Sequence, residues 1–162
     1  MKTNNVTRML DAKKIKYQSF ELPERKISAL DTAEMLQVTP ELIYKSIVLL
    51  RTTPRTKPIL AVIPATHQAD PSALSAFLKE KKVKPASLTE AEKLTGLQAG
   101  GISPLALINK GFQILFSDQA DQNEFIHVSG GELGLNLCLA VKDLLTLTHA
   151  RTAPISILME EE

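Results

Sequence analysis

Lys45 and two glycine-bearing segments are the residues of this sequence whose types and spacing best suit chemistry. Lys45 stands before Ser46 and the apolar run IVLL at 47–50, so its ammonium lies at the mouth of an expected buried strand and needs solvent, a carboxylate or a ligand. The segments AGGISP at 99–104 and VSGG at 128–131 supply glycines, which allow close main-chain approach. Main-chain amides and one cation together favour a polar, anionic or carbonyl-bearing ligand, because such donors stabilise charge on an oxygen.

Each of these features also has a purely structural explanation. A Gly-Gly pair near a proline is common in a turn between two elements. A lysine at the end of a strand commonly extends its ammonium into water. Only the combination of the three segments indicates a site.

Most catalytic and metal-binding patterns are missing from the sequence. The three histidines and the one cysteine show neither zinc-ligand spacing nor a C-x-x-C pair: His67, His127, His149 and Cys138. No serine stands in G-x-S-x-G, and neither G-x-G-x-x-G nor a P-loop occurs. We therefore expect no metal and no cofactor, and we expect surface or structural roles for the histidines.

Apolar periodicity and capping residues predict a series of short helices and strands. Helices are expected near 3–14, 29–37, 71–80, 88–94 and 142–147, with a further helical turn beginning at Thr39–Pro40. Strands are expected at 15–22, 46–51, 58–64, 113–118, 124–131, 135–141 and 153–159. The second and third of these strands should form a hairpin, because a polar, proline-bearing stretch separates them.

Composition and element order indicate one ordinary globular domain. The 162 residues are 44% hydrophobic and 23% charged, with few aromatic residues and no Trp, so aliphatic side chains must form the core. Hairpins mixed with helices predict an α/β fold with a mixed sheet or irregular barrel and peripheral short helices, in a single domain over residues 1–162. The lone Cys138 and the lack of a signal-type opening predict a cytoplasmic protein, and no apolar run is long enough to span a membrane.

The charge of the chain is nearly balanced, but basic residues cluster locally. The formal net charge of +1 argues against a protein that binds nucleic acid by bulk electrostatics alone. Each basic cluster is either a solvated surface or a weak RNA contact. The clusters are Lys13, Lys14 and Lys16; Arg51, Arg55 and Lys57; and Lys79, Lys81, Lys82 and Lys84.

Three ordered motifs resemble the bacterial YbaK/EbsC family, whose members are free-standing relatives of the editing insertion domain of prolyl-tRNA synthetase. The motifs are YKSIVLL at 44–50, LTGLQAGGISPLAL at 94–107 and IHVSGGELGLNLCLAVKDL at 126–144. The resemblance covers nearly the whole chain. It implies a compact, mixed-sheet, barrel-like editing domain and a trans-editing deacylase that clears mischarged tRNA(Pro), with Cys-tRNA(Pro) as the leading substrate.

The resemblance also implies roles for individual residues of this sequence. It gives catalytic roles to Lys45, Gly101 and Ser129. It gives substrate-binding roles to a second set of residues: Leu22, Gly100, Ile102, Ser103, Pro104, Gly130, Gly131 and Asn136. In Cys-specific members the substrate thiol attacks its own ester carbonyl, so the protein mainly positions the reacting groups.

The sequence departs from the family pattern at two positions. Asn136 in GLNLCL stands where Cys-specific relatives tend to have Asp, and a family Tyr is replaced near Leu22. Either change could alter the accepted group, so alanine and serine are alternatives to cysteine. A non-catalytic tRNA- or synthetase-binding module, or a hydrolase with Ser103 or Ser129 as nucleophile, is also compatible with the sequence. The implied partners are the acceptor end of tRNA(Pro) and, additionally, prolyl-tRNA synthetase.

Overall fold

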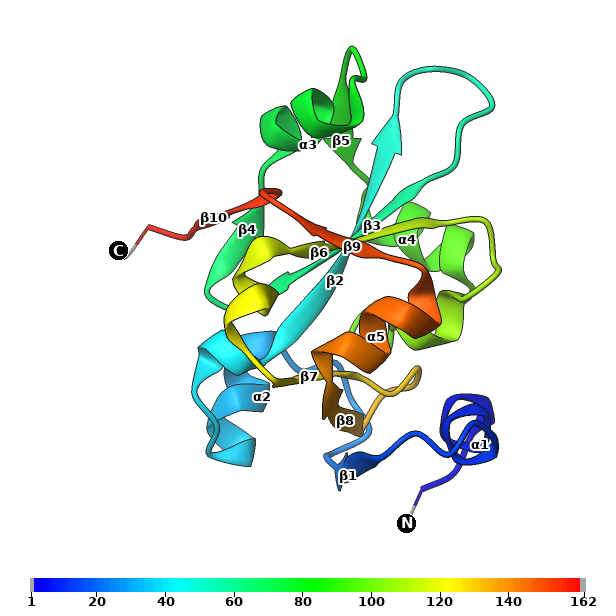
Figure 1. Ribbon diagram of the computed structural model, residues 1–162, viewed down its shortest axis with the longest axis vertical. Helices are drawn as coiled ribbons and strands as arrows, with labels where there is room; N and C mark the ends of the chain where they lie inside the picture. The colour runs from blue at the N-terminus through cyan, green and yellow to red at the C-terminus, as the bar shows by residue number, and fades with distance from the viewer. Residues whose placement is uncertain (1, 161–162) are drawn as a thin grey trace.

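The computed structural model describes residues 2–160 and shows a mixed α/β fold built on three sheets (Figure 1). The largest sheet contains β2 (Tyr44–Arg51), β3 (Ile59–Pro64), β5 (Val83–Pro85), β6 (Gln113–Ser117) and β9 (Arg151–Ala153). Its strand order is β5-β2-β3-β6-β9. A three-stranded sheet in the order β1-β8-β7 contains β1 (Tyr17–Glu21), β7 (Phe125–Ser129) and β8 (Leu135–Ala140), and a small sheet pairs β4 (His67–Ala69) with β10 (Ser156–Leu158).

Short helices connect and flank these strands. The α-helices are α1 (Asn5–Ala12), α2 (Ala29–Leu36), α3 (Pro71–Leu78), α4 (Leu88–Thr95) and α5 (Val141–Thr148). Single 3-10 turns are η1 (Pro40–Leu42), η2 (Pro104–Leu107) and η3 (Asp118–Gln122). The expected caps are present: Ser28 accepts from the N–H of Asp31, and Ser87 and Glu90 form a reciprocal capping box that fixes the start of α4.

The β2–β3 hairpin forms the centre of the large sheet. All six residues of β3 are buried, which explains why this run is continuously apolar rather than alternating. β3 pairs antiparallel with β2 and parallel with β6, and β6 pairs parallel with β9. The sheet is therefore mixed, as the sequence predicted.

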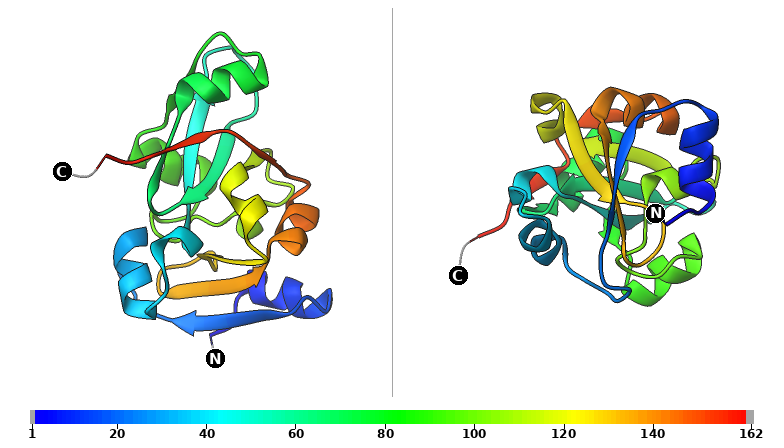
Figure 2. Two further views of the ribbon diagram at one scale, coloured as in Figure 1. Left: turned by 60° about the vertical axis from the view of Figure 1, so that its left-hand side comes forward. Right: turned by 90° about the horizontal axis from the view of Figure 1, so that it is seen from below.

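The main core lies between the large sheet and the three-stranded sheet, which Figure 2 shows stacked along the long axis. Alternate side chains of β2 and β3, among them Val48 and Leu60, meet Leu137 and Leu139 of β8 in this core. The opposite face of the large sheet packs a second cluster against α3, with Leu74 fully buried there. The large sheet is thus covered on both faces.

The predicted fold class is confirmed, with three differences in detail. The strands of residues 2–160 form open sheets and do not close into a barrel. The expected strand at 153–159 is shorter, and β10 covers only Ser156–Leu158. The three-residue strands β4, β5 and β9 are additions that the sequence did not predict. Among the helices of residues 2–160, none has the length and apolar character that crossing a bilayer requires.

Candidate functional site

A cavity of about 310 Å³ opens beside the first half of β2. Its walls come from segments that are far apart in sequence: the stretch 22–32, the beginning of β2, residues 86–91, the loop 99–102 and the facing ends of β7 and β8. In Figure 1, β2 begins next to α2 and β7, and here the large sheet contacts the three-stranded sheet. The cavity therefore lies where the two sheets meet.

Within residues 2–160, no strand pairs with the first half of the β2 edge that faces the cavity. β5 pairs with β2 only from Leu49 to Arg51. Just before that pairing, the carbonyl of Val48 accepts from the N–H of Ala86 at 2.9 Å, on the side away from β3. Ser46 lies two residues earlier, so the antiparallel pattern directs its main-chain N–H and C=O to the same side. Ser46 lines the cavity, which therefore has a main-chain donor and acceptor in its wall.

Lys45 also lines the cavity, and its ammonium is weakly engaged. Its Nζ lies 3.5 Å from the carbonyl oxygen of Ala65, at the long limit of a hydrogen bond. No carboxylate within residues 2–160 forms an ion pair with it. Burial lowers the pKa of the Lys45 ammonium, because desolvation disfavours the charged form. A ligand anion or carbonyl oxygen would supply the partner that this cation lacks.

The loop AGGISP contributes its first half to the cavity and its second half to the core. Gly100 and Ile102 line the cavity, and Gly100 adopts a φ of +91°. Gly101 lies behind them: its N–H donates to the carbonyl of Gln98 at 2.8 Å, and a Cβ there would stand 3.1 Å from the main chain of Glu132. Ser103 is fully buried and caps η2 by accepting from the N–H of Leu105, and Pro104 is buried as the first residue of that turn.

The second glycine segment divides in the same way. Ser129 lines the cavity, and its Oγ accepts from the N–H of Gly131 at 3.2 Å. Gly130 packs against Leu135, and its carbonyl accepts from the side chain of Asn4 at 2.9 Å. Gly131 faces away, toward Val6 on α1 and a different hollow. The first glycine segment nevertheless contacts the chain just after the second, since Gly101 abuts Glu132.

Asn136 and Leu22 both lie in the cavity wall. Asn136 is buried, and its Oδ1 accepts from the Nδ1–H of His127 at 2.8 Å. Burial is the main cause that lowers the pKa of His127, and the hydrogen bond to Asn136 raises it in part. Leu22 donates its N–H to the carbonyl of Gly134 at 2.8 Å, and this bond fixes its main chain. Its apolar side chain stands near the position where the family resemblance implies a tyrosine.

The structure thus brings some of the predicted residues together and not others. Six of the eleven share the cavity: Leu22, Lys45, Gly100, Ile102, Ser129 and Asn136. The other five support its walls from behind: Gly101, Ser103, Pro104, Gly130 and Gly131. Sequence reasoning missed other contributors to the wall, among them Arg25, the open main chain at Ser46, and Gly134 with its φ of +81°.

The cavity can bind and polarise a ligand, but it contains no assembled nucleophile and base. The Oγ of Ser129 receives its only contact from a main-chain N–H within residues 2–160, and the Nδ1 of the neighbouring His127 is already bonded to Asn136. Among the described residues, no three His, Cys, Asp or Glu side chains gather in a way that could hold a metal ion. The polar groups of the cavity wall are therefore two cations, one amide side chain, several hydroxyl groups and main-chain groups.

Comparison with solved structures gives the class of this fold. The chain superposes on the crystal structure of the hypothetical protein APE2540 with a TM-score of 0.85 and 19% identity, over 95% of this chain and 100% of that one. It superposes on the "crystal structure of a putative trans-editing enzyme for prolyl tRNA synthetase" with a TM-score of 0.77 and 20% identity, over 97% and 99% of the two chains. The protein therefore shares the fold of these two chains.

Sequence comparison gives the family. The model of the aminoacyl-tRNA editing domain matches residues 24–147, and the chain belongs to this family. It is 32% identical over 154 residues to the "Putative Cys-tRNA(Pro)/Cys-tRNA(Cys) deacylase EbsC" of Enterococcus faecalis, and covers 92% of that protein with 94% of its own length. The resemblance inferred from the three motifs is thereby confirmed.

Proposed function

We propose that this protein is an aminoacyl-tRNA deacylase that clears mischarged tRNA(Pro), with cysteine as the leading aminoacyl group. The observation that carries the proposal is the cavity in which the weakly engaged ammonium of Lys45 shares a wall with Ser129 and Asn136 but with no nucleophile and base pair. The family and the name of the EbsC relative support the same class of substrate. At about 310 Å³, the cavity lies at the small end of the range of ligand pockets.

In this proposal the protein positions an ester that cleaves itself. The thiol sulfur of the cysteinyl group attacks its own ester carbonyl carbon and forms a C–S bond, while the bond from that carbon to the ribose oxygen breaks. The thiol proton ends on the ribose oxygen, which leaves as a free hydroxyl of the tRNA, and water later opens the thiolactone. The Lys45 ammonium and the main-chain donors stabilise the carbonyl oxygen as it gains negative charge.

The alternative of a serine hydrolase has less support. Ser103 is fully buried and holds η2 in place, so it cannot reach a substrate. Ser129 reaches the cavity, but no base stands beside its Oγ. A serine without a base is a weak nucleophile at neutral pH.

Residues 1–162 act in this proposal as one cytoplasmic editing unit that works in trans. A synthetase pocket for proline cannot strongly reject a slightly smaller side chain, because a missing methylene is worth only about 1 to 3 kcal/mol. A separate protein must then remove the error. With a net charge of +1, the chain needs help to select tRNA(Pro), and prolyl-tRNA synthetase is the partner that would supply it.

Because position 136 carries an amide, alanyl and seryl groups remain alternative substrates. An amide both donates and accepts hydrogen bonds, whereas the carboxylate expected in Cys-specific relatives only accepts. The wall is therefore neutral at position 136, where a carboxylate would be anionic. A change of this kind alters which small polar group the site prefers.

The direct test is to incubate the protein with tRNA(Pro) charged with Cys, Ala, Ser or Pro and to follow loss of the ester. We expect acceleration on at least one mischarged species, none on Pro-tRNA(Pro), and a large loss in Lys45→Ala. A protein that accelerates none of the mischarged species is not a deacylase and fits the binding-module alternative. Activity that survives Lys45→Ala unchanged would reject the site.

Two controls separate the chemical routes. Blocking the thiol of Cys-tRNA(Pro) by S-methylation removes the internal nucleophile, so the self-cleavage route predicts near-complete loss of turnover. Ser103→Ala and Ser129→Ala together should leave Cys-tRNA(Pro) cleavage partly intact, whereas a serine hydrolase would lose orders of magnitude in rate.

A further inference from the structure

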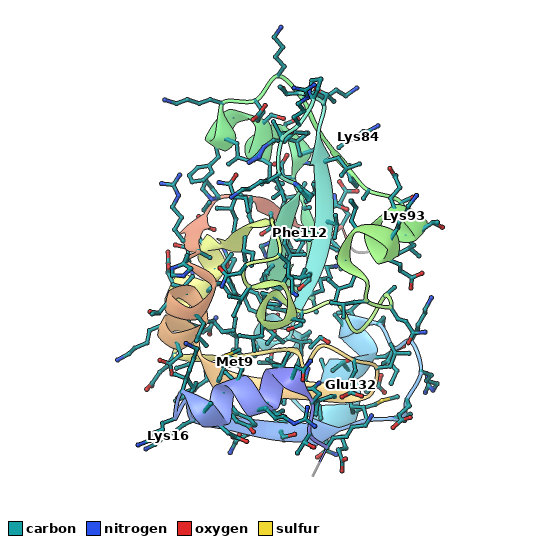
Figure 3. All side chains as sticks on the ribbon, turned by 90° about the vertical axis from the view of Figure 1, so that its right-hand side faces the viewer. Met9, Lys16, Lys84, Lys93, Phe112 and Glu132 are labelled. Atoms are coloured by element: carbon teal, nitrogen blue, oxygen red, sulfur yellow. The ribbon has the colours of Figure 1, made fainter. Side chains whose placement is uncertain are left out.

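Two clusters of three lysines lie toward opposite ends of the molecule. One follows α1 and consists of Lys13, Lys14 and Lys16, and the other precedes and enters β5 and consists of Lys81, Lys82 and Lys84. All six side chains are exposed, and within residues 2–160 none forms an ion pair. Figure 3 shows one member of each, Lys16 near the bottom of the long axis and Lys84 in its upper part. The sequence alone does not distinguish the two clusters.

The β5 cluster has the more regular geometry. Val83 is buried, so Lys82, just before β5, and Lys84, within it, lie on the opposite, exposed side of this extended segment. Residues two apart in a strand are separated by about 6.6 Å, so the two lysines present their ammonium groups in a row. The main chain here is fixed, because Lys84 pairs with Leu50 of β2 and the carbonyl of Lys82 accepts from Thr52.

The β5 cluster also continues directly into the wall of the cavity. Ala86, two residues after Lys84, donates its N–H to Val48 and lines the cavity, as do Leu88 and Ala91 of the following helix. A nucleic-acid strand that lies along residues 82–84 is therefore directed toward the cavity. Arg25 stands in the cavity wall and adds a further cation to the path.

Glu80 and Glu90 lie near the β5 cluster, and within residues 2–160 only Glu80 of the two is paired with a cation. Glu80 forms an ion pair with Arg51 at 3.3 Å. Glu90 accepts from the N–H of Ser87 at 3.1 Å in the capping box of α4. Further cations extend the same end of the molecule, where α3, β5 and the β2–β3 loop lie together (Figure 1): Arg55, Lys57 and Lys79.

The α1 cluster has a different setting. Lys14 and Lys16 border a separate hollow of about 610 Å³, which is also lined by Lys142 and by three carboxylates, those of Asp121, Glu124 and Asp143. Three carboxylates so close to the lysines oppose the binding of a polyanion. This hollow shares no residue with the candidate site.

We propose that the exposed face of β5, formed by Lys82 and Lys84 with Lys81 at its start, binds phosphates of the RNA strand whose esterified 3′ end lies in the cavity. The inference rests on the proposed deacylase function and adds a path for the substrate to it. A row of ammonium groups that leads into a cavity for an ester complements a strand that carries one phosphate per nucleotide and ends in that ester. An acidic protein surface would need no such alignment with the cavity.

This contact has a defined salt signature. Each phosphate neutralised on a single strand contributes a slope of about 0.7 to the fall of log affinity with log salt. Loss of two or three such contacts should reduce the slope for tRNA by about 1.4 to 2. Removal of unrelated surface charge should reduce it far less.

The test compares two variants that lose the same charge from opposite ends. One carries Lys81→Gln, Lys82→Gln and Lys84→Gln, and the control carries Lys13→Gln, Lys14→Gln and Lys16→Gln. Each triple variant loses three positive charges, which takes the formal net charge from +1 to −2. We measure kcat and KM for deacylation, and binding of uncharged tRNA, as functions of salt concentration. The expected result is a KM raised about tenfold or more in the β5 variant at unchanged kcat, with the reduced slope, and near wild-type values in the control.

A minimal substrate completes the experiment. A 3′-aminoacyl ester of adenosine has the reacting ester but no phosphates, so the wild type and both variants should cleave it equally. Equal effects of both variants on tRNA, or no effect of the β5 variant, would overturn the proposal, as would loss of cleavage of the minimal ester by the β5 variant. A β5 variant that binds prolyl-tRNA synthetase less well and tRNA equally well would assign the surface to a protein partner instead.

These results also separate the inference from the proposed function. A wild-type protein that cleaves neither substrate rejects the deacylase proposal. The binding arm then still decides whether the lysine face on β5 contacts RNA. A wild type that is active, with a β5 variant that matches it at every salt concentration, rejects the lysine face alone.

Discussion

The Nδ1 nitrogen of His127 lies 2.8 Å from the Oδ1 of Asn136, and this contact fixes the direction of an amide in the cavity wall. His127 pairs opposite Cys138 across β7 and β8, so Asn136 is its diagonal neighbour on the same face of the sheet. A carbonyl oxygen only accepts, so the His127 ring donates. Asn136 lines the cavity, and its Nδ2 group donates no hydrogen bond within residues 2–160, so we expect it to serve as a donor to a ligand there.

If this orientation matters, substitution of His127 should affect activity only through Asn136. We expect His127→Phe to lower kcat/KM by about fivefold to tenfold, because one buried hydrogen bond is worth about 1 kcal/mol. In an Asn136→Ala background the same substitution should cost nothing further. The measurement is a double-mutant cycle on kcat/KM.

The exposed His149 provides the control for that cycle, as His149→Asn tolerates the same left-handed backbone and should change neither background. Equal losses from His127→Phe in both backgrounds would show that the histidine acts on the fold as a whole and not on the amide.

His127 should also make stability depend on pH. Burial lowers its pKa below the ordinary 6.5, so below that value the unfolded chain binds more protons than the folded one. The contribution of neutral His127 to the free energy of unfolding is then fully present above pH 6.5. It decreases as the pH falls below 6.5 toward the lowered pKa of the folded protein. Denaturant titrations between about pH 7.5 and pH 5 should show a smaller decrease for His127→Phe than for the wild type.

His67 contributes in the same direction, so it must be tested separately. Burial is the main cause that lowers its pKa, Asp118 raises it and Lys45 lowers it. We expect His67→Gln to remove a further part of the pH dependence and the double variant to remove more than either single one. A His127→Phe protein whose stability follows the wild-type curve at every pH contradicts the assignment.

Lys45 should set an alkaline limit on activity. Burial lowers the pKa of its ammonium below the ordinary 10.5, and the cation is lost as the pH rises through the lowered value. Lys45→Arg keeps its charge at all accessible pH values. After subtraction of uncatalysed ester hydrolysis, we expect kcat/KM of the wild type to fall at alkaline pH. The kcat/KM of Lys45→Arg should not fall over the same pH range, whatever its value at neutral pH.

Lys45→Met serves as the neutral reference for that profile. It should be slower by about 100-fold at neutral pH, the usual cost of one lost preorganised donor, and should show no alkaline decline. A Lys45→Arg profile that declines in parallel with the wild type would place the titrating group elsewhere.

The fold was predictable where local sequence determines structure. Ser87 and Glu90 stand three residues apart and form the capping box that their spacing predicts, and the continuous apolar run of β3 lies at the centre of its sheet. The strands β4, β5 and β9 were not predictable, because each has three residues and depends on its partner. Three residues are too few to show a period of two, and the pairing of β9 with β6 is a tertiary contact.

The residues of the candidate site were likewise predictable only in part. Lys45 and Ser129 stand in motifs that the family resemblance covers, and both reach the cavity. The open edge at Ser46 exists because β5 is short, and no local pattern reports the length of a partner strand. His127 was expected to be structural, but its bond to Asn136 depends on the register of two strands joined by a turn.

The last prediction concerns Gly134, which closes the cavity wall against Leu22. Gly134 has a φ of +81°, and a Cβ there would stand 2.7 Å from the carbonyl oxygen of Leu22, which is main chain and cannot move aside cheaply. Gly134→Ala should therefore lower the free energy of unfolding through both backbone strain and overlap, by about 2 to 4 kcal/mol. Gly96 offers a matched control, because its φ of +71° imposes the same strain while nothing lies within 4 Å of the added methyl. Gly96→Ala should cost only about 1 to 2 kcal/mol in the same denaturant titration. Equal losses of unfolding free energy for the two substitutions would mean that the contact between Gly134 and the Leu22 carbonyl is looser than described.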